Sequence, residues 1–223
     1  MQQPLGKVEP KQPFGKVEPK LMSPFMQPLG KVELLAFIEN RYPAEDEEEK
    51  KEKRDIYTAL IECVVTQGHT STAKAMTIEL LPSTMPYADV AMMAFHLSLQ
   101  LQTLERKGYS LLFWQAADIL WINQEFYLLA NLTQLVPLLR KKPEQLMLTY
   151  PQGLPFPIAA CAPEVLQMKA LPFITHRSCS YYSLALMCLR QLNLSLVALQ
   201  GTKLFYFLER CLKEDPLERY CYF

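Results

Sequence analysis

The stretch DIYTALIECVVTQGHTSTAKAMTIELL (residues 55–81) contains two apolar runs separated by a glycine, Gly68. In the first run, apolar residues such as Ile56 and Leu60 recur at the spacing of one face of an α-helix. Asp55 is a suitable N-cap, and Gly68 can adopt the left-handed conformation that ends a helix. The first run therefore predicts a helix that ends before Gly68.

The second run predicts another helix. Thr70 or Ser71 can cap its start, Met76 and Leu80 belong to its apolar face, and Pro82 ends it. A turn of only a few residues between two helices makes them antiparallel neighbours. Residues 55–81 thus predict a helical hairpin.

This hairpin resembles a helical-hairpin repeat, nearer the pentatricopeptide than the tetratricopeptide type. In the pentatricopeptide pattern a Tyr-x-x-Leu-Ile helix leads through Gly to a second helix centred on Ala. The resemblance implies stacked helical hairpins and recognition of RNA bases by successive repeats; Ala59 occupies the base-reading position, and alanine has no side-chain hydrogen bond to offer. The matching residues are Tyr57, Leu60, Ile61, Gly68 and Ala73.

Further helices are predicted along the rest of the chain. Residues 88–106 form a long amphipathic segment that stops at Gly108, and the very apolar residues 109–139 supply one or two more helices. Two last helices are expected over residues 180–192 and from 194 or 195 to 213. The predicted fold is all-α, an irregular, solenoid-like bundle of helical hairpins over residues 55–223.

The N-terminal part, residues 1–54, is predicted to be a disordered tail rich in proline and charge. The phrase Gln-Pro-(Leu or Phe)-Gly-Lys-Val-Glu occurs three times, beginning at Gln3, Gln12 and Gln27. A duplicated tether and a multivalent binding segment both explain such a repeat. After the third copy a short helix is expected to end near Arg41, and the following charged block is expected to be a solvated linker.

Residues 141–172 are punctuated by prolines and predict a long loop that ends in a short helix beginning at Pro163. Its apolar side chains are poor candidates for free exposure to water, so the loop is expected to lie along the helices or to receive a partner. The residues predicted to bind a partner are Tyr57 and Leu60 on the first hairpin and Tyr150, Leu154 and Phe156 in the loop.

Composition narrows the classes of function. The chain has 23 basic and 23 acidic residues, so net charge gives no signal for DNA or for an anionic membrane. Polar residues interrupt the apolar segment 109–139, so no membrane span is expected. Six scattered cysteines, with no secretory signal ahead of them, favour an intracellular protein of the cytoplasm or nucleus.

No catalytic or phosphate-binding motif is present, and the three histidines have no convincing partners in sequence. We predict no cofactor and no metal site. The sequence favours an intracellular protein–protein interaction or scaffold module built from helical hairpins, without enzymatic activity. The alternatives are an RNA-associated helical-repeat protein and an enzyme whose active site is assembled from distant residues; the oligomeric state is not predicted.

Overall fold

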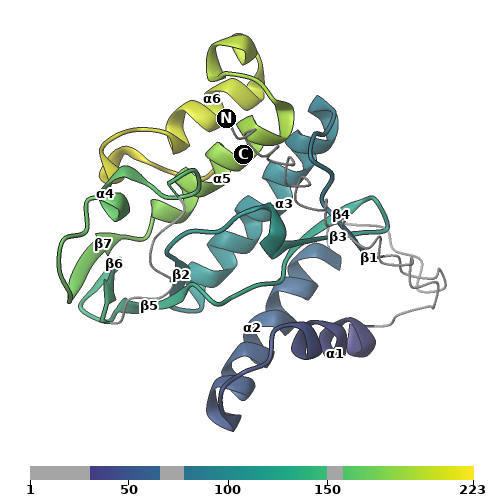
Figure 1. Cartoon of the computed structure of the whole chain (residues 1–223), viewed down its shortest axis with the longest axis vertical. Helices are drawn as coiled ribbons and strands as arrows, with labels where there is room; N and C mark the ends of the chain where they lie inside the picture. Colours follow the sequence, from purple (N-terminus) through teal and green to yellow (C-terminus); the bar gives the residue numbers. More distant parts are fainter. Residues whose placement is uncertain (1–30, 66–77, 150–157) are drawn as a thin grey trace, which may run out of the picture.

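The computed structural model describes residues 31–65, 78–149 and 158–223. These residues form helices together with two antiparallel sheets (Figure 1). The fold is therefore mixed α and β, and the predictions of an all-α fold, of a helical-hairpin solenoid and of a helical repeat are wrong.

The helices are α1 (Lys31–Arg41), α2 (Glu47–Val65), α3 (Tyr87–Arg106), α4 (Pro163–Leu166), α5 (Cys179–Leu192) and α6 (Lys203–Cys211), with short 3-10 turns η1 (Ala116–Asp118), η2 (Leu196–Leu199) and η3 (Pro216–Glu218). In Figure 1 helices α1 and α2 lie at the bottom, α3 crosses the centre, α4 lies at the left and α6 lies at the top.

The strands form a three-stranded sheet in the order β1-β3-β4 and a four-stranded sheet in the order β2-β5-β6-β7, and every pairing is antiparallel. Their bounds are β1 (Ile78–Leu80), β2 (Tyr109–Leu111), β3 (Ile119–Ile122), β4 (Phe126–Leu129), β5 (Leu135–Leu139), β6 (Lys142–Leu148) and β7 (Phe173–His176).

Helix α3 is the centre of the fold and confirms the helix predicted over residues 88–106. Its apolar residues recur every three or four positions and are buried against α2, α5 and β4. The helix ends before Gly108, whose φ of +88° suits glycine. The buried amide of Gln100 fastens the helix to β4: its Nε2 donates to the carbonyl of Tyr127 at 2.7 Å, and its Oε1 accepts from the amide of Leu129 at 2.8 Å.

The packed region begins before the predicted boundary at residue 54. Helix α1 ends at Arg41 as predicted, but Leu34 and Ile38 on it are buried in the core. The charged block continues as the first turns of α2 and is stabilised there by ion pairs such as Lys53–Glu49 at 2.7 Å. Helix α1 is thus packed on the core, and the charged block is helical from Glu47 onward but largely exposed. The repeat copies before α1 fall outside the described residues apart from the end of the third.

The second helix of the predicted hairpin is absent from the part of it that the structure describes, residues 78–81. Residues 66–77, which include Gly68 and Ala73, lie outside the described residues. Ile78–Leu80, expected to be helical, is strand β1 and pairs with β3. Tertiary pairing has overridden a helical spacing that rested on only a few residues.

The apolar segment 109–139 forms four strands instead of helices. All four residues of β4 are buried, as are three of the four in β3, so neither strand shows an alternating pattern. The turn between them has Asn123 at φ 54° and Gln124 at φ 58°, as a type I′ hairpin turn requires. Strands buried on both faces resemble buried helices in sequence, which explains the wrong prediction.

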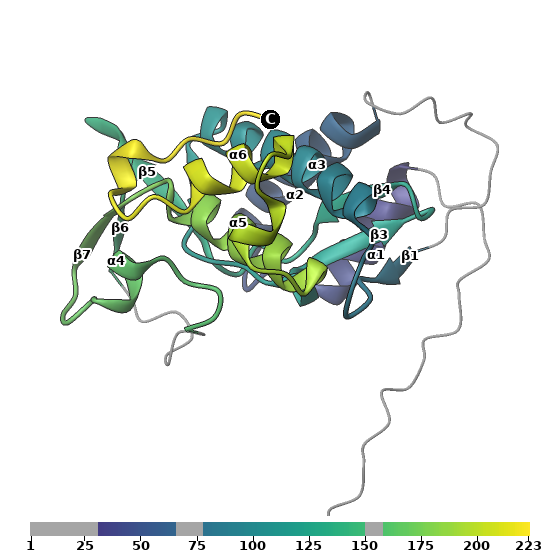
Figure 2. The ribbon, with the colours of Figure 1, turned by 90° about the horizontal axis from the view of Figure 1, so that it is seen from above.

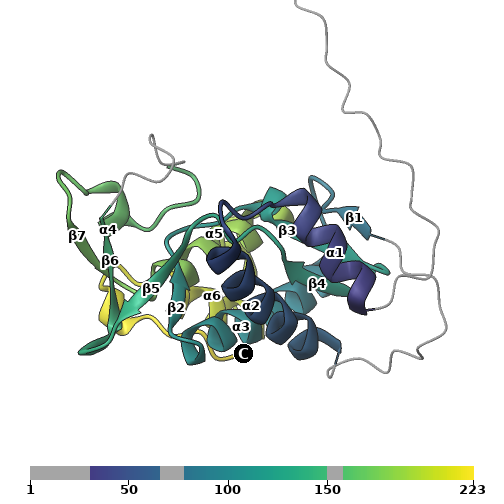
Figure 3. The ribbon, with the colours of Figure 1, turned by 90° about the horizontal axis from the view of Figure 1, so that it is seen from below.

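Two clusters of buried side chains hold the fold together. The larger lies among α1, α2, α3, α5, α6 and the three-stranded sheet, and the smaller lies under the four-stranded sheet beside α4. Helix α5 contributes Leu184 to the first and Cys179 to the second. Figures 2 and 3 show β6 and β7 at the margin of the molecule, away from α1, α2 and α3.

Candidate functional site

The histidines of the described residues serve the fold. His96 is buried, stacks on Phe126 with 5.7 Å between ring centroids, and has its pKa lowered by burial. The Nδ1 atom of His176 lies 2.7 Å from the Ser178 hydroxyl, which donates to the carbonyl of Pro216, also at 2.7 Å. Ser178 is fully buried, so no substrate reaches this hydroxyl. His69 lies outside the described residues.

The buried cysteines are held as thiols. Burial raises the pKa of Cys161 to about 12, and it raises the pKa of Cys179 and Cys188 as well. Because the thiolate is the nucleophile and the metal ligand, these side chains are unreactive where they stand. Within residues 31–65, 78–149 and 158–223, no group of three or more His, Cys, Asp or Glu residues is placed to hold a metal ion.

Two buried ionic clusters join elements of the fold. Tyr181 donates a hydrogen bond to Glu105, and Arg177 Nε lies 3.5 Å from the other oxygen of that carboxylate. Burial raises the pKa of Glu105, and these two contacts oppose the rise. Arg219 has a fully buried side chain and binds both oxygens of Glu164, at 2.6 and 3.0 Å. In each cluster a carboxylate is held by side chains from another element of the fold, so we assign both clusters a structural role.

A more open feature is the four-stranded sheet, whose two faces differ. Val136, Leu146 and Leu148 point to one face and are buried in the smaller cluster. Successive residues of a strand point to opposite faces, and the intervening residues of β5, β6 and β7 include exposed Pro137, Met147 and Ile174. We call these three residues the outer face. Met147 is 37% exposed and Ile174 is 52% exposed, so both leave apolar area in water.

The outer face is continuous across the strands. Met147 and Ile174 are cross-strand partners in the β6–β7 register. Pro137 and Met147 both line a groove of about 340 Å³, formed by residues 135–140 and 147–149. An apolar row of this kind beside a groove gives side chains of a partner a place to bind.

Strand β7 is the edge of its sheet. The backbone N–H of Arg177 donates a hydrogen bond to the carbonyl of Glu144 at 2.9 Å. This bond shows which residues of β7 use their backbone groups to pair with β6. In an antiparallel pair the bonded residues alternate, so Phe173 and Thr175 also face β6. Ile174 and His176 therefore direct their backbone N–H and C=O groups away from the sheet.

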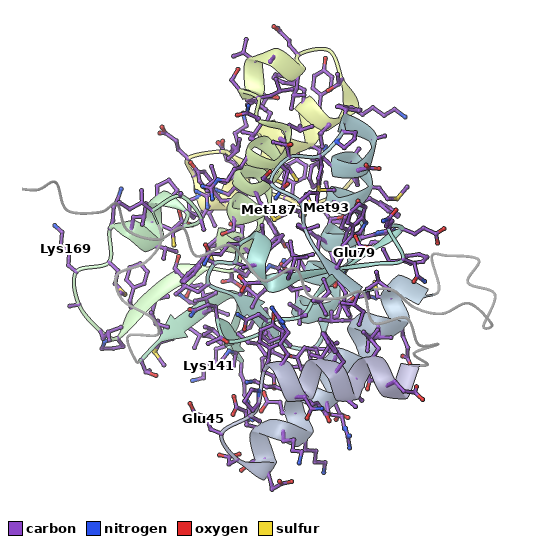
Figure 4. The ribbon with its side chains drawn as sticks, turned by 45° about the vertical axis from the view of Figure 1, so that its right-hand side comes forward. Glu45, Glu79, Met93, Lys141, Lys169 and Met187 are labelled. Carbon is purple, nitrogen blue, oxygen red and sulfur yellow. The ribbon has the colours of Figure 1, made fainter. Side chains whose placement is uncertain are left out.

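Positive charge lies near both ends of the β6–β7 pair. Arg140, Lys141 and Lys142 lie at the turn between β5 and β6, and Lys169 precedes β7 in the chain. Figure 4 shows the side chains of Lys141 and Lys169 pointing outward at separate places on this side of the molecule. Across the described part of the chain, none of these four side chains has an ion-pair partner.

Two of the residues predicted to bind a partner, Tyr57 and Leu60, belong to the core. They are at most 1% exposed, and Tyr57 donates a hydrogen bond from its hydroxyl to the carbonyl of Ala130 at 2.8 Å. The other three, Tyr150, Leu154 and Phe156, fall outside the described residues. The role of all five in binding stays a prediction.

Sequence reasoning missed the outer face because it assigned residues 141–172 to a loop. A partial signal was present in Phe173-Ile174-Thr175, which has strand-forming residue types, whereas Leu146-Met147-Leu148 is continuously apolar and lacks the alternation of a half-buried strand. The prolines around them outweighed that signal. The short helix predicted to begin at Pro163 is confirmed as α4.

Neither a scan against protein-family models nor a search among curated proteins found a match for this chain. In the described ranges, every helix is too short or too polar to span a membrane.

Proposed function

We propose that the chain is a protein-interaction module, and that its outer face binds a segment of a partner protein. The observation that carries this proposal is the row of exposed apolar side chains across three strands, Pro137, Met147 and Ile174, beside a groove. Burying Met147 and Ile174 against a partner would remove apolar surface from water, which is the main favourable contribution to protein association.

The alternatives have less support. The RNA-associated alternative depended on a helical repeat, and the mixed fold removes that basis. An enzyme whose active site is assembled from distant residues remains a prediction. It has less support because the titratable groups described above are buried or engaged in structural contacts. An intracellular location, cytoplasmic or nuclear, is part of the proposal: the buried cysteines Cys161, Cys179, Cys188, Cys211 and Cys221 are reduced thiols, as expected in a reducing compartment.

Site-specific photocrosslinking tests the proposal. The photoreactive residue p-benzoylphenylalanine replaces Ile174 in one version of the full chain and Val197 in another, in cells of the species that encodes the protein. Val197 is a matched control because it is also apolar and is 74% exposed, on the 3-10 turn η2. We expect a defined adduct with another protein from position 174 and none with that protein from position 197.

The protein identified in the adduct is then purified and its affinity for this chain is measured by calorimetry. We expect the double substitution Met147→Glu with Ile174→Glu to weaken binding at least about tenfold, because a charged side chain cannot be buried against an apolar partner without a large desolvation cost. Val197→Glu should leave the affinity unchanged. Equal affinities for the wild type and the double variant, or the same adducts from both positions, would overturn the proposal.

A further inference from the structure

We propose that the partner segment is an extended strand with acidic residues that pairs with the free edge of β7 and becomes a fifth strand of the sheet. This inference rests on the proposed function and deepens it, because it names the backbone conformation and the charge of the segment that the outer face takes.

The edge itself supplies the first argument. Ile174 and His176 direct backbone N–H and C=O groups away from β6, as the Arg177–Glu144 hydrogen bond and the β6–β7 register require. Among the described residues, no backbone hydrogen bond outside the strand ladders uses the groups of Ile174. A row of such groups is a template for pairing with another extended chain.

The outer face supplies the second argument. In a strand paired with β7, alternate side chains would lie on the same side of the sheet as Ile174 and Met147. Ile174 is 52% exposed, against 37% for Met147, and it is on β7 itself. The partner therefore needs apolar side chains, preferably β-branched, at every second position.

Charge supplies the third argument. Three cations, Arg140, Lys141 and Lys142, are at the turn that leads into β6, and Lys169 is ahead of β7. Glu144 is the one carboxylate on β6, so the two strands and these flanking segments carry a clear positive excess. Carboxylates at the two ends of the partner strand would be attracted by Lys169 at one end and, across β6, by the cations of the β5–β6 turn at the other.

The same charges disfavour a second copy of this chain as the occupant. If β7 paired with β7 of another copy in antiparallel fashion, Lys169 of one copy would approach the cationic turn of the other. Like charges brought together in this way oppose association. A shared edge between two copies is therefore not the arrangement that the charges favour.

The length of the edge limits the expected affinity. From Lys169 to His176 the segment holds eight residues, and four of these are in β7. A partner strand of about five residues spans roughly 17 Å at the rise of an extended chain. Contacts of this size give dissociation constants on the order of micromolar, since the surface buried is well below that of a stable complex.

Synthetic peptides test the inference with the full-length purified chain. One nine-residue peptide alternates Val or Ile with Glu or Asp, a second replaces the acids by Lys, and a third replaces them by Ser. Fluorescence anisotropy should give the tightest binding for the acidic peptide, at least about tenfold tighter than for the basic one, with a dissociation constant that rises with salt. Equal affinities for the three peptides would overturn the acidic character while leaving the proposed function standing.

Backbone pairing has a separate test. A strand uses the N–H groups of alternate residues to bind its neighbour, so N-methylation of one alternate set in the acidic peptide should abolish binding and methylation of the other set should preserve it. Equal binding by both methylated peptides would overturn the added strand. If no acidic peptide binds while the photocrosslink at position 174 forms, the inference fails and the proposed function survives; if neither occurs, both fail.

Variants of the chain complete the experiment. Ile174→Pro removes a backbone N–H that points away from β6, and an edge strand tolerates proline at such a position. Ile174→Ala removes the apolar side chain and keeps that N–H. We expect the proline variant to bind the acidic peptide more weakly than the alanine variant. Lys141→Glu should weaken binding several-fold, and Lys203→Glu, an exposed cation on α6, should not; equal effects of the two charge reversals would contradict the placement of the strand.

Discussion

Strands β4 and β7 have the same length and differ in what covers them. All four residues of β4 are buried, and Gln100 on α3 saturates the backbone groups of Tyr127 and Leu129. On β7, Thr175 is buried but Ile174 is half exposed, and the outer backbone groups point away from β6. Strand β4 therefore serves stability on both of its faces, whereas β7 serves stability on one face and, within the described residues, leaves its second face partly exposed and its outer edge without a neighbouring strand.

This difference separates substitutions into two classes. Changes in the buried clusters should lower the free energy of unfolding, and changes on the outer face should alter binding while stability stays within about 1 kcal/mol of the wild type. The experiments below test whether the two classes are distinct.

The largest loss of stability is expected for Arg219→Ala. The arginine side chain is fully buried, binds both oxygens of Glu164, and donates to the carbonyls of Lys213 and Glu214. Its removal leaves a partly buried carboxylate without its partner, which costs about 3–5 kcal/mol of unfolding free energy. Urea denaturation measures the loss, with Arg106→Ala, an exposed arginine, as the control; a loss under 1 kcal/mol would show that the C-terminal segment is not held by this pair.

Two neighbours on β6 give the sharpest contrast between the faces. Leu146 is fully buried and Met147 is 37% exposed. Leu146→Ala should cost about 2–4 kcal/mol because it leaves a cavity in the smaller cluster, whereas Met147→Ala should cost less than about 1 kcal/mol. The same denaturation experiment measures both, and similar losses would mean that both faces of the sheet are covered.

The buried amide of Gln100 should matter almost as much as a core leucine. Gln100→Leu fills a similar volume but leaves the amide of Leu129 and the carbonyl of Tyr127 without their side-chain partner, at a cost of about 2 kcal/mol. Thermal unfolding of this variant beside Gln102→Leu, a less buried change on the same helix, measures the difference. If Gln100→Leu leaves the stability unchanged, the hydrogen bonds from Gln100 to β4 do not stabilise the packing of α3 on that strand.

The smallest effect is a dependence of stability on pH through His96. Burial lowers the pKa of His96 from its ordinary value of 6.5, so the unfolded chain binds a proton more readily than the folded protein does. The stability that this histidine contributes is present above pH 6.5 and is lost as the pH falls from there towards the lowered pKa. The unfolding free energy of the wild type should therefore fall more steeply from pH 7.5 to 5.5 than that of His96→Leu, and equal slopes would contradict the burial of this ring.

The sequence was sufficient for the elements that have a helical period and clear ends. Helix α3 has apolar residues at every third or fourth position and stops before Gly108; α5 does likewise and ends at Asn193, whose φ is 51°. The last predicted helix is present only in part, since η2 and α6 are separated by Gly201 at φ 85°. In these segments local preference and tertiary packing agree.

The strands and the outer face could not be found in the same way. The segments ILWI and FYLL of β3 and β4 are continuously apolar, so a period of 2 is absent and a helix is an equally good interpretation. Met147 and Ile174 are far apart in the chain, and only the register of β6 and β7 makes them neighbours. A binding surface made by strand pairing is a property of the fold, and no single stretch of sequence contains it.

Amide hydrogen exchange along β7, measured residue by residue by NMR, tests the open edge most directly. In the free protein we expect fast exchange at Ile174 and His176 and slow exchange at Phe173, Thr175 and Arg177, because only the second set faces β6. Addition of the acidic peptide should slow exchange at Ile174 and His176. Slow exchange at Ile174 in the free protein, or no change at either residue when the bound peptide is present, would contradict the account.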